Sequence, residues 1–133
     1  MYRSVIVRSL CGVACLVGGA ALASPALAQN EVAAFMKAKL LHSEKVLEGL
    51  ATEDFDLIVK HSQAISLLCE DELWSVINTP EYLERSKEFR RSVNAITEAG
   101  RKKNLEAAAL AYVNTTLSCI NCHKYVRKAR ADR

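Results

Sequence analysis

The chain has 133 residues, of which 50% are hydrophobic and 25% charged, and its formal net charge is +3. This length allows one small domain, and the nearly balanced charge excludes the strongly basic surface that nucleic-acid-binding domains carry.

The first 28 residues have the pattern of a secretory signal peptide. Arg3 and Arg8 give a positive start, an apolar run follows, and Ala26-Leu27-Ala28 is a small-x-small cleavage site. The apolar run is shorter than the roughly 20 residues that a membrane-spanning helix needs. A lipoprotein would need a cysteine in a lipobox, and neither Cys11 nor Cys15 follows one. We therefore expect export to the periplasm, cleavage before Gln29 and no membrane span afterwards.

Residues 29–133, the expected mature domain, contain few prolines and glycines and carry a net charge of +1, because Arg3 and Arg8 leave with the signal. Apolar residues recur at helical spacing, so we expect an all-α domain. A first helix precedes the turn at Thr52-Glu53-Asp54, and a second runs from about Glu53, with Thr52 as its cap, to Ile77. The inward stripe of the first helix is predicted to be Val32, Met36, Leu40, Ser43, Leu47 and Leu50.

The third and fourth predicted helices have clear starting signals. Thr79 can cap the third helix, with Pro80 at its first position, and Asn104 can cap the fourth. The third helix carries an inward heptad of Tyr82, Ser86, Phe89, Val93, Ile96 and Gly100, and the fourth an inward stripe of Leu105, Ala109, Tyr112, Thr116, Cys119, His123 and Val126. Short connections predict an antiparallel up-down-up-down four-helix bundle.

The sequence Cys119-Ile120-Asn121-Cys122-His123 is the C-x-x-C-H pattern of covalent haem c attachment. Two thiols at this spacing can add to the two vinyl groups of one porphyrin, and the next residue is a histidine that can bind the iron. A zinc site would need four ligands, and a dithiol redox motif would need a strand before the helix. An export signal favours haem, because attachment takes place outside the cytoplasm.

The sixth iron ligand is predicted to be Met36, the only methionine of the mature domain. If the first and last helices are antiparallel neighbours, Met36 and His123 lie at a similar level, at 1.5 Å rise per residue. His42, His61 or a vacant position are the alternatives, and both histidines are otherwise expected to be ordinary surface or satisfied helix residues. A His/Met pair suits electron transfer. Cys69 is expected to be a buried core thiol.

At these residues the chain resembles the cytochrome c-prime family, in particular its low-spin, methionine-ligated relatives. The resemblance rests on Cys119 to His123 followed by Lys124-Tyr125-Val126-Arg127, since a basic residue four after the haem histidine is typical of that family. It implies a left-handed antiparallel four-helix bundle with haem on the last helix, thioethers at Cys119 and Cys122, His123 as axial ligand and Met36 as distal ligand. The mature chain is somewhat shorter than is usual in the family, which leaves a family-like homodimer open.

Further candidates surround this motif. Arg127 is the candidate partner of a haem propionate, and Tyr112 and Thr116 are candidate pocket residues. The basic last turns form either a solvated tail or a docking patch for an acidic redox partner. We expect a periplasmic electron carrier that is not an enzyme. A five-coordinate haem protein that binds or senses NO or CO is the alternative, and a non-haem metal-binding helical module is the third hypothesis.

Overall fold

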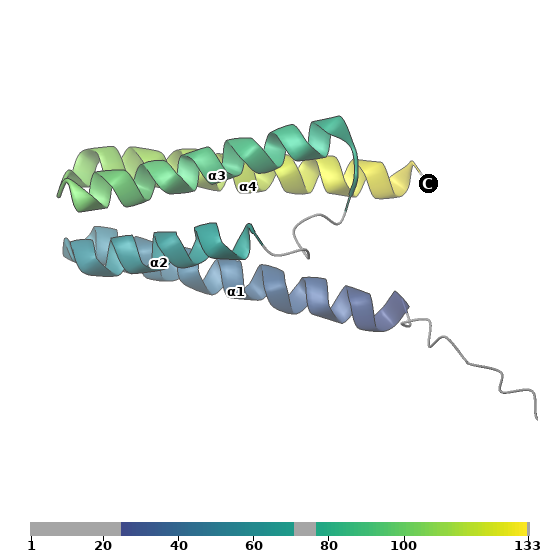
Figure 1. The fold of residues 1–133 in the computed structure, drawn as a ribbon, viewed down its shortest axis with the longest axis horizontal. Coiled ribbons are helices and arrows are strands. Elements are labelled where there is room, and N and C mark those ends of the chain that lie inside the picture. The colour runs from purple at the N-terminus through teal and green to yellow at the C-terminus, as the bar shows by residue number, and fades with distance from the viewer. Residues whose placement is uncertain (1–24, 71–76, 133) are drawn as a thin grey trace, which may run out of the picture.

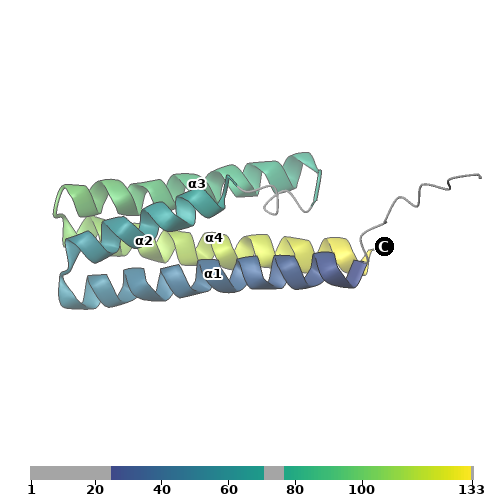
Figure 2. The ribbon, with the colours of Figure 1, turned by 60° about the horizontal axis from the view of Figure 1, so that its bottom comes forward.

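The computed structural model describes residues 25–70 and 77–132, and all regular elements in these ranges are helices. They are α1 (Pro25–Thr52), α2 (Phe55–Leu68), α3 (Pro80–Arg101) and α4 (Leu105–Ala131). α1 lies beside α2, and α3 lies beside α4, so that the two pairs form a four-helix bundle (Figure 1). The described start of α1 and the end of α4 lie at the same end of this bundle (Figure 2). The expected all-α, four-helix fold is therefore confirmed.

The predicted signal peptide lies outside the described residues, apart from residues 25–28, which belong to the first turns of α1. The predicted cleavage before Gln29 would thus leave nearly all of this 28-residue helix in place. No helix within the described ranges has both the length and the apolar character needed to cross a membrane.

Side-chain caps set the beginnings of three helices. Thr79 Oγ1 accepts a hydrogen bond from the backbone N–H of Tyr82 (3.2 Å), and Asn104 Oδ1 accepts one from Ala107 (2.9 Å), so both predicted caps are confirmed. The prediction that Thr52 caps α2 is wrong: Asp54 Oδ1 accepts from the N–H of Leu57 at 2.9 Å. Thr52 remains in α1 and donates to the carbonyl of Glu48. Glu53, at φ 56°, makes the left-handed turn that ends α1, which moves the cap two residues along.

α2 ends at Leu68, well before the predicted Ile77, and residues 71–76 lie outside the described part of the chain. The N–H of Cys69 is shared between the carbonyls of Ile65 and Ser66, and the N–H of Glu70 bonds to Leu67, so the helix tightens in its last turn. The sequence places acids at positions 70, 71 and 72. Negative charge at the C-terminus of a helix opposes the helix dipole, which accounts for an end at this point.

The core follows the predicted heptad of α3 but not the predicted stripes of α1 and α4. All six predicted α3 residues are buried. On α1, Leu40 and Leu47 are 59% and 52% exposed, and the buried residues are Phe35, Lys39, Val46 and Gly49. On α4, Thr116 and His123 are exposed, and the buried face consists of Ala108, Ala111, Thr115, Ser118 and Cys122. Small side chains let α4 approach its neighbours closely, so its small-residue face is buried in place of the bulkier one.

Candidate functional site

The C-x-x-C-H motif lies on α4, and its two thiols face the bundle. Cys122 is buried, Cys119 is half-buried against the core cluster, and His123 is exposed beside them. At about 100° per residue in an α-helix, Cys122 lies roughly 60° to one side of Cys119 and His123 roughly 40° to the other. The three sulfur and nitrogen donors therefore share one side of α4. The expectation that His123 points fully into the interior is wrong, because the buried face is centred nearer Cys122.

Residues from all four helices surround the side chain of Lys39 in the interior of the bundle, in a group that we call the cysteine layer. It contains Phe35 and Lys39 of α1, Cys69 at the end of α2, Phe89 of α3, and Cys119 and Cys122. Lys39 is 8% exposed, and its Nζ lies 4.0 Å from the centroid of the Phe89 ring and 5.9 Å from that of Phe35. A side chain from α1 thus crosses the interior to the thiols of α2 and α4.

Burial raises the pKa of the Cys69, Cys119 and Cys122 thiols, and the positive charge of Lys39 only partly opposes this effect. These thiols are therefore protonated at neutral pH. Cysteines that act in disulfide exchange or bind metals have a lowered pKa in electropositive surroundings. Moreover, in the described ranges no three His, Cys, Asp or Glu residues come together as a group that could hold a metal ion. The raised pKa of the thiols weighs against a dithiol redox centre.

Lys39 and His123, two basic groups near the motif, have a lowered pKa. Burial lowers the pKa of Lys39 from 10.5 to about 8, with the nearby thiols acting in the opposite direction. Desolvation by the surrounding protein lowers the pKa of His123, and the charges of Arg127 and Lys39 lower it further. This holds although the His123 ring has a large solvent-accessible surface, since protein atoms still displace part of its hydration. The neutral imidazole is the form that binds metals.

Of the other predicted site residues, Met36 and Tyr112 pack against the same core cluster as Cys119. Met36 is half-buried, and this cluster contains Phe35. Tyr112 also accepts a hydrogen bond from Ser43 Oγ of α1 at 3.3 Å. Thr116 is exposed, and its hydroxyl donates to the carbonyl of Tyr112, so its place in a haem pocket stays a prediction. Arg127 is exposed one turn after His123.

Lys39 was not among the predicted site residues, because lysine is seldom buried. The signal that could have found it is the spacing of Phe35, Lys39, His42, Val46 and Gly49, with steps of four, three, four and three. This set competes with the predicted stripe for the inward side of α1. The predicted stripe contains three leucines, Leu40, Leu47 and Leu50, and is therefore the more apolar of the two.

The second missed feature is a contact between His42 of α1 and His61 of α2. Their Nδ1 atoms lie 2.8 Å apart and the ring centroids 5.1 Å apart. With the nitrogens so much closer than the centroids, the two Nδ1 atoms point at each other, as in an N–H···N hydrogen bond. The expectation that both are ordinary surface or satisfied helix residues missed this contact. A metal ion bound to both would need the rings to move apart or rotate.

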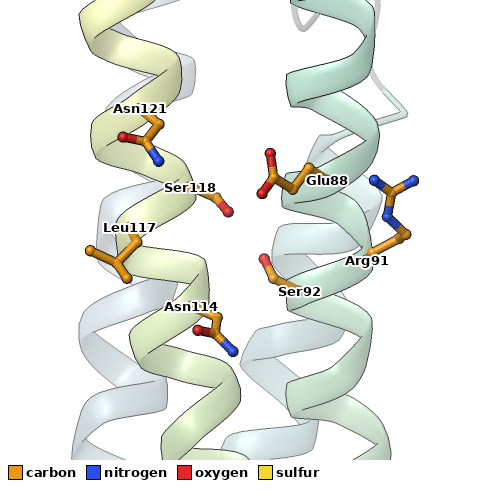
Figure 3. A pocket seen from close by; sticks show the side chains of 7 residues that line it. All are labelled: Glu88, Arg91, Ser92, Asn114, Leu117, Ser118 and Asn121. Atoms are coloured by element: carbon orange, nitrogen blue, oxygen red, sulfur yellow. The ribbon is translucent and has the colours of Figure 1, made fainter.

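Two open grooves line α3 and α4, and neither contains the motif cysteines. The first, of about 470 Å³, has Glu88, Arg91 and Ser92 of α3 on one side and Asn114, Leu117, Ser118 and Asn121 of α4 on the other (Figure 3). The second, of about 540 Å³, lies further toward the end of α4 and includes Arg85, Lys124 and Tyr125. Leu117 and Asn121 are roughly 160° away from Cys119 around the helix. The first groove is therefore on the opposite side of α4 from Cys119, and its lining residue Ser118 is only about 40° from Cys122 around the helix.

Comparison of the chain with models of protein families, with curated proteins and with solved structures finds no match.

Proposed function

We propose that this protein is a periplasmic c-type cytochrome of the cytochrome c-prime type, which carries single electrons on one covalent haem. Cys119 and Cys122 would form the thioethers, His123 would be the proximal ligand and Met36 the distal ligand. The helices would run in antiparallel up-down-up-down order. The observation that carries the proposal is the C-x-x-C-H motif on α4, with one thiol buried and the other half-buried against the core.

The chemistry of the donor set fits a covalent haem. The Cys119 and Cys122 thiols are protonated, and Cys119 packs against the core cluster that contains the apolar rings of Phe35 and Phe89, which could pack against a porphyrin. His123 lies on the same side of the helix, and its lowered pKa favours the neutral form that can coordinate iron. When bound, a haem would supply an iron that accepts and gives up one electron.

The register between α1 and α4 supports Met36 as the distal ligand. Ser43 of α1 donates to Tyr112 of α4. If the two helices are antiparallel, moving seven residues, or about two turns, back along α1 leads to Met36. The same step forward along α4 leads to Cys119, and both residues pack against the same core cluster. Met36 Sδ would therefore approach from α1 at the level of the motif.

Arg127 would bind a haem propionate, and the basic end of α4 would attract a redox partner. Arg127 lies four residues after His123 and is exposed, so its guanidinium can reach a propionate at the surface. Lys124, Lys128 and Arg130 are also exposed there. A redox partner with an acidic surface would be attracted to this end of the molecule.

Covalent attachment is tested with a pyridine haemochrome assay on protein made in cells with the haem export machinery. The wild type is expected to retain haem after denaturation, and the Cys119→Ala/Cys122→Ala variant is expected to lose it. Cys69→Ala is the matched control, since Cys69 is a buried thiol of the same layer outside the motif and its removal should leave attachment intact. A wild type without covalent haem would refute the proposal.

The sixth ligand is tested by the absorption spectrum of the oxidised protein. A low-spin spectrum with the weak methionine-to-iron band at the red end of the visible range is expected, and Met36→Ala should abolish this band. A wild type that is high-spin and readily takes up carbon monoxide would instead support the five-coordinate, gas-binding alternative.

A further inference from the structure

Lys39 is a buried amine in the interior of the bundle. Among residues 30–70 and 77–132 it is the only charged side chain that is buried. Lysine is almost never buried without a specific reason, and the long side chain could have reached solvent from the surface of a helix at little cost. Packing alone therefore does not account for its place among two phenylalanine rings and three thiols.

The position of Lys39 relative to the motif suggests what that reason is. It lies three residues after Met36, about one turn further along α1, and it is more deeply buried than Met36. Its Nζ interacts with Cys69 through a hydrogen bond and with the thiols of Cys119 and Cys122 through its charge. The lysine side chain thus extends from α1, the helix on which the distal ligand is expected, across the interior toward the motif thiols.

We propose that Lys39 provides a second axial donor on α1, whose Nζ binds the haem iron when the Met36 thioether is absent or displaced. This inference rests on the proposed function, because it requires a haem at Cys119 and Cys122. Ligand exchange would break the iron–sulfur bond, form an iron–nitrogen bond and release one proton from the ammonium group to solvent. No oxidant or reductant is needed.

The chemistry of the amine is consistent with this role. Only a neutral amine has a lone pair to donate, and burial brings the pKa of Lys39 down to about 8. An exposed lysine, with an ordinary pKa near 10.4, would need a much higher pH to compete. Arginine cannot take the role, because its guanidinium stays protonated in proteins.

The test compares the spin state of four haem-loaded, oxidised proteins at one mildly alkaline pH, by absorption and electron paramagnetic resonance. These are the wild type, Met36→Ala, Met36→Ala/Lys39→Leu, and the control Met36→Ala/Lys37→Leu, in which an exposed lysine of the same helix is removed. We expect Met36→Ala and the control to stay low-spin with nitrogenous ligation, and Met36→Ala/Lys39→Leu to become high-spin. Circular dichroism checks that the double variants keep their helices, and Lys39→Gln replaces Lys39→Leu if the leucine variant does not fold.

Each outcome separates the two proposals. A high-spin Met36→Ala protein, or a low-spin Met36→Ala/Lys39→Leu protein, would overturn the role of Lys39 and leave the His/Met cytochrome standing. A wild type that is low-spin without the methionine band, together with a low-spin Met36→Ala protein and a high-spin Met36→Ala/Lys39→Leu protein, would support Lys39 and refute Met36 as the distal ligand. Protein without covalent haem would overturn both.

Discussion

The His42–His61 contact makes the stability of the protein depend on pH. A hydrogen bond between the two Nδ1 atoms needs at least one neutral ring as acceptor. Partial burial lowers the pKa of His61, and a positive charge on His42 lowers it further. A lowered pKa in the folded state means that the unfolded chain binds more protons, so stability falls as the pH falls below the ordinary value of 6.5. The loss levels off below the folded-state pKa.

We therefore expect the urea midpoint of unfolding to fall as the pH is lowered through this window, and His61→Gln to flatten this dependence. Gln63→Ala, two residues away, exposed and uncharged, is the matched control and should keep the wild-type pH dependence. Equal pH profiles for the wild type and His61→Gln would show that the pair does not govern acid sensitivity.

The cap of α4 gives a prediction about a single side chain. Asn104 Oδ1 accepts a hydrogen bond from the N–H of Ala107, and loss of such a cap typically costs about 1 kcal/mol. Asn104→Ala should lower the free energy of unfolding in denaturant titrations by about this amount. Asn114→Ala is the control, because Asn114 is exposed in the middle of the same helix, where alanine is the better helix former. Equal effects of the two substitutions would contradict the capping role.

Close approach between α1 and α2 depends on Gly49. A Cβ at this position would lie 2.9 Å from Ile58 Cγ1 and 3.0 Å from the backbone oxygen of Asp54. At Gly100 of α3, the nearest atoms are the tips of the Val59 and Ile58 side chains, at 3.0 and 3.1 Å. Side-chain tips can shift, whereas the backbone of the α1–α2 turn cannot do so without disturbing the Asp54 cap.

Gly49→Ala should therefore be more destabilising than Gly100→Ala. Overpacking in a core typically costs about 1 to 3 kcal/mol, and the better helix propensity of alanine offsets up to about 1 kcal/mol of it. Thermal or urea unfolding of the two variants measures the difference. A Gly49→Ala protein as stable as the wild type would mean that the two helices can move apart freely.

The sequence predicted the elements unequally, for reasons that differ between helices. α3 has one apolar stripe among many charges, so its six inward residues were all identified. α1 and α4 each carry two candidate stripes, and on α1 the exposed Leu40 and Leu47 made the wrong one look apolar. Packing between the helices determines which of two such stripes is buried, and the sequence pattern of a single helix does not show this. The end of α2 was missed because apolar residues continue beyond the acids that end it.

The candidate site was predictable as far as it is local in the sequence. The C-x-x-C-H motif lies within five consecutive residues, so Cys119, Cys122 and His123 could be identified without a structure. Lys39 and the His42–His61 contact join residues of different helices, and each needs the packing of the bundle to become visible. A lysine at an inward position gives no local signal of its burial, because lysine is usually exposed.

The whole molecule carries an uneven surface charge that should affect its reactions. Lys124, Arg127 and Lys128 are exposed near the motif and in the last turns of α4. Charge steering between exposed groups is screened over about 10 Å at 0.1 M salt. We expect the rate of electron transfer with an acidic redox protein to fall as ionic strength rises, and Arg127→Glu/Lys128→Glu to slow it at low salt.

The control for this prediction is Lys60→Glu/Lys87→Glu, which reverses the same number of exposed charges on α2 and α3. Stopped-flow measurements with one acidic partner would compare the variants at matched driving force. If both double variants slow the reaction equally, net charge and not the end of α4 determines the association.

The intact mass of the exported protein, measured after alkylation under denaturing conditions, tests the central claim most directly. With residues 1–28 removed, the mature chain has three cysteines, Cys69, Cys119 and Cys122. A covalent haem would leave Cys69 as the only thiol that reacts, and the mass would be that of the polypeptide plus one haem and one alkyl group. A polypeptide without haem that carries three alkyl groups would contradict the account.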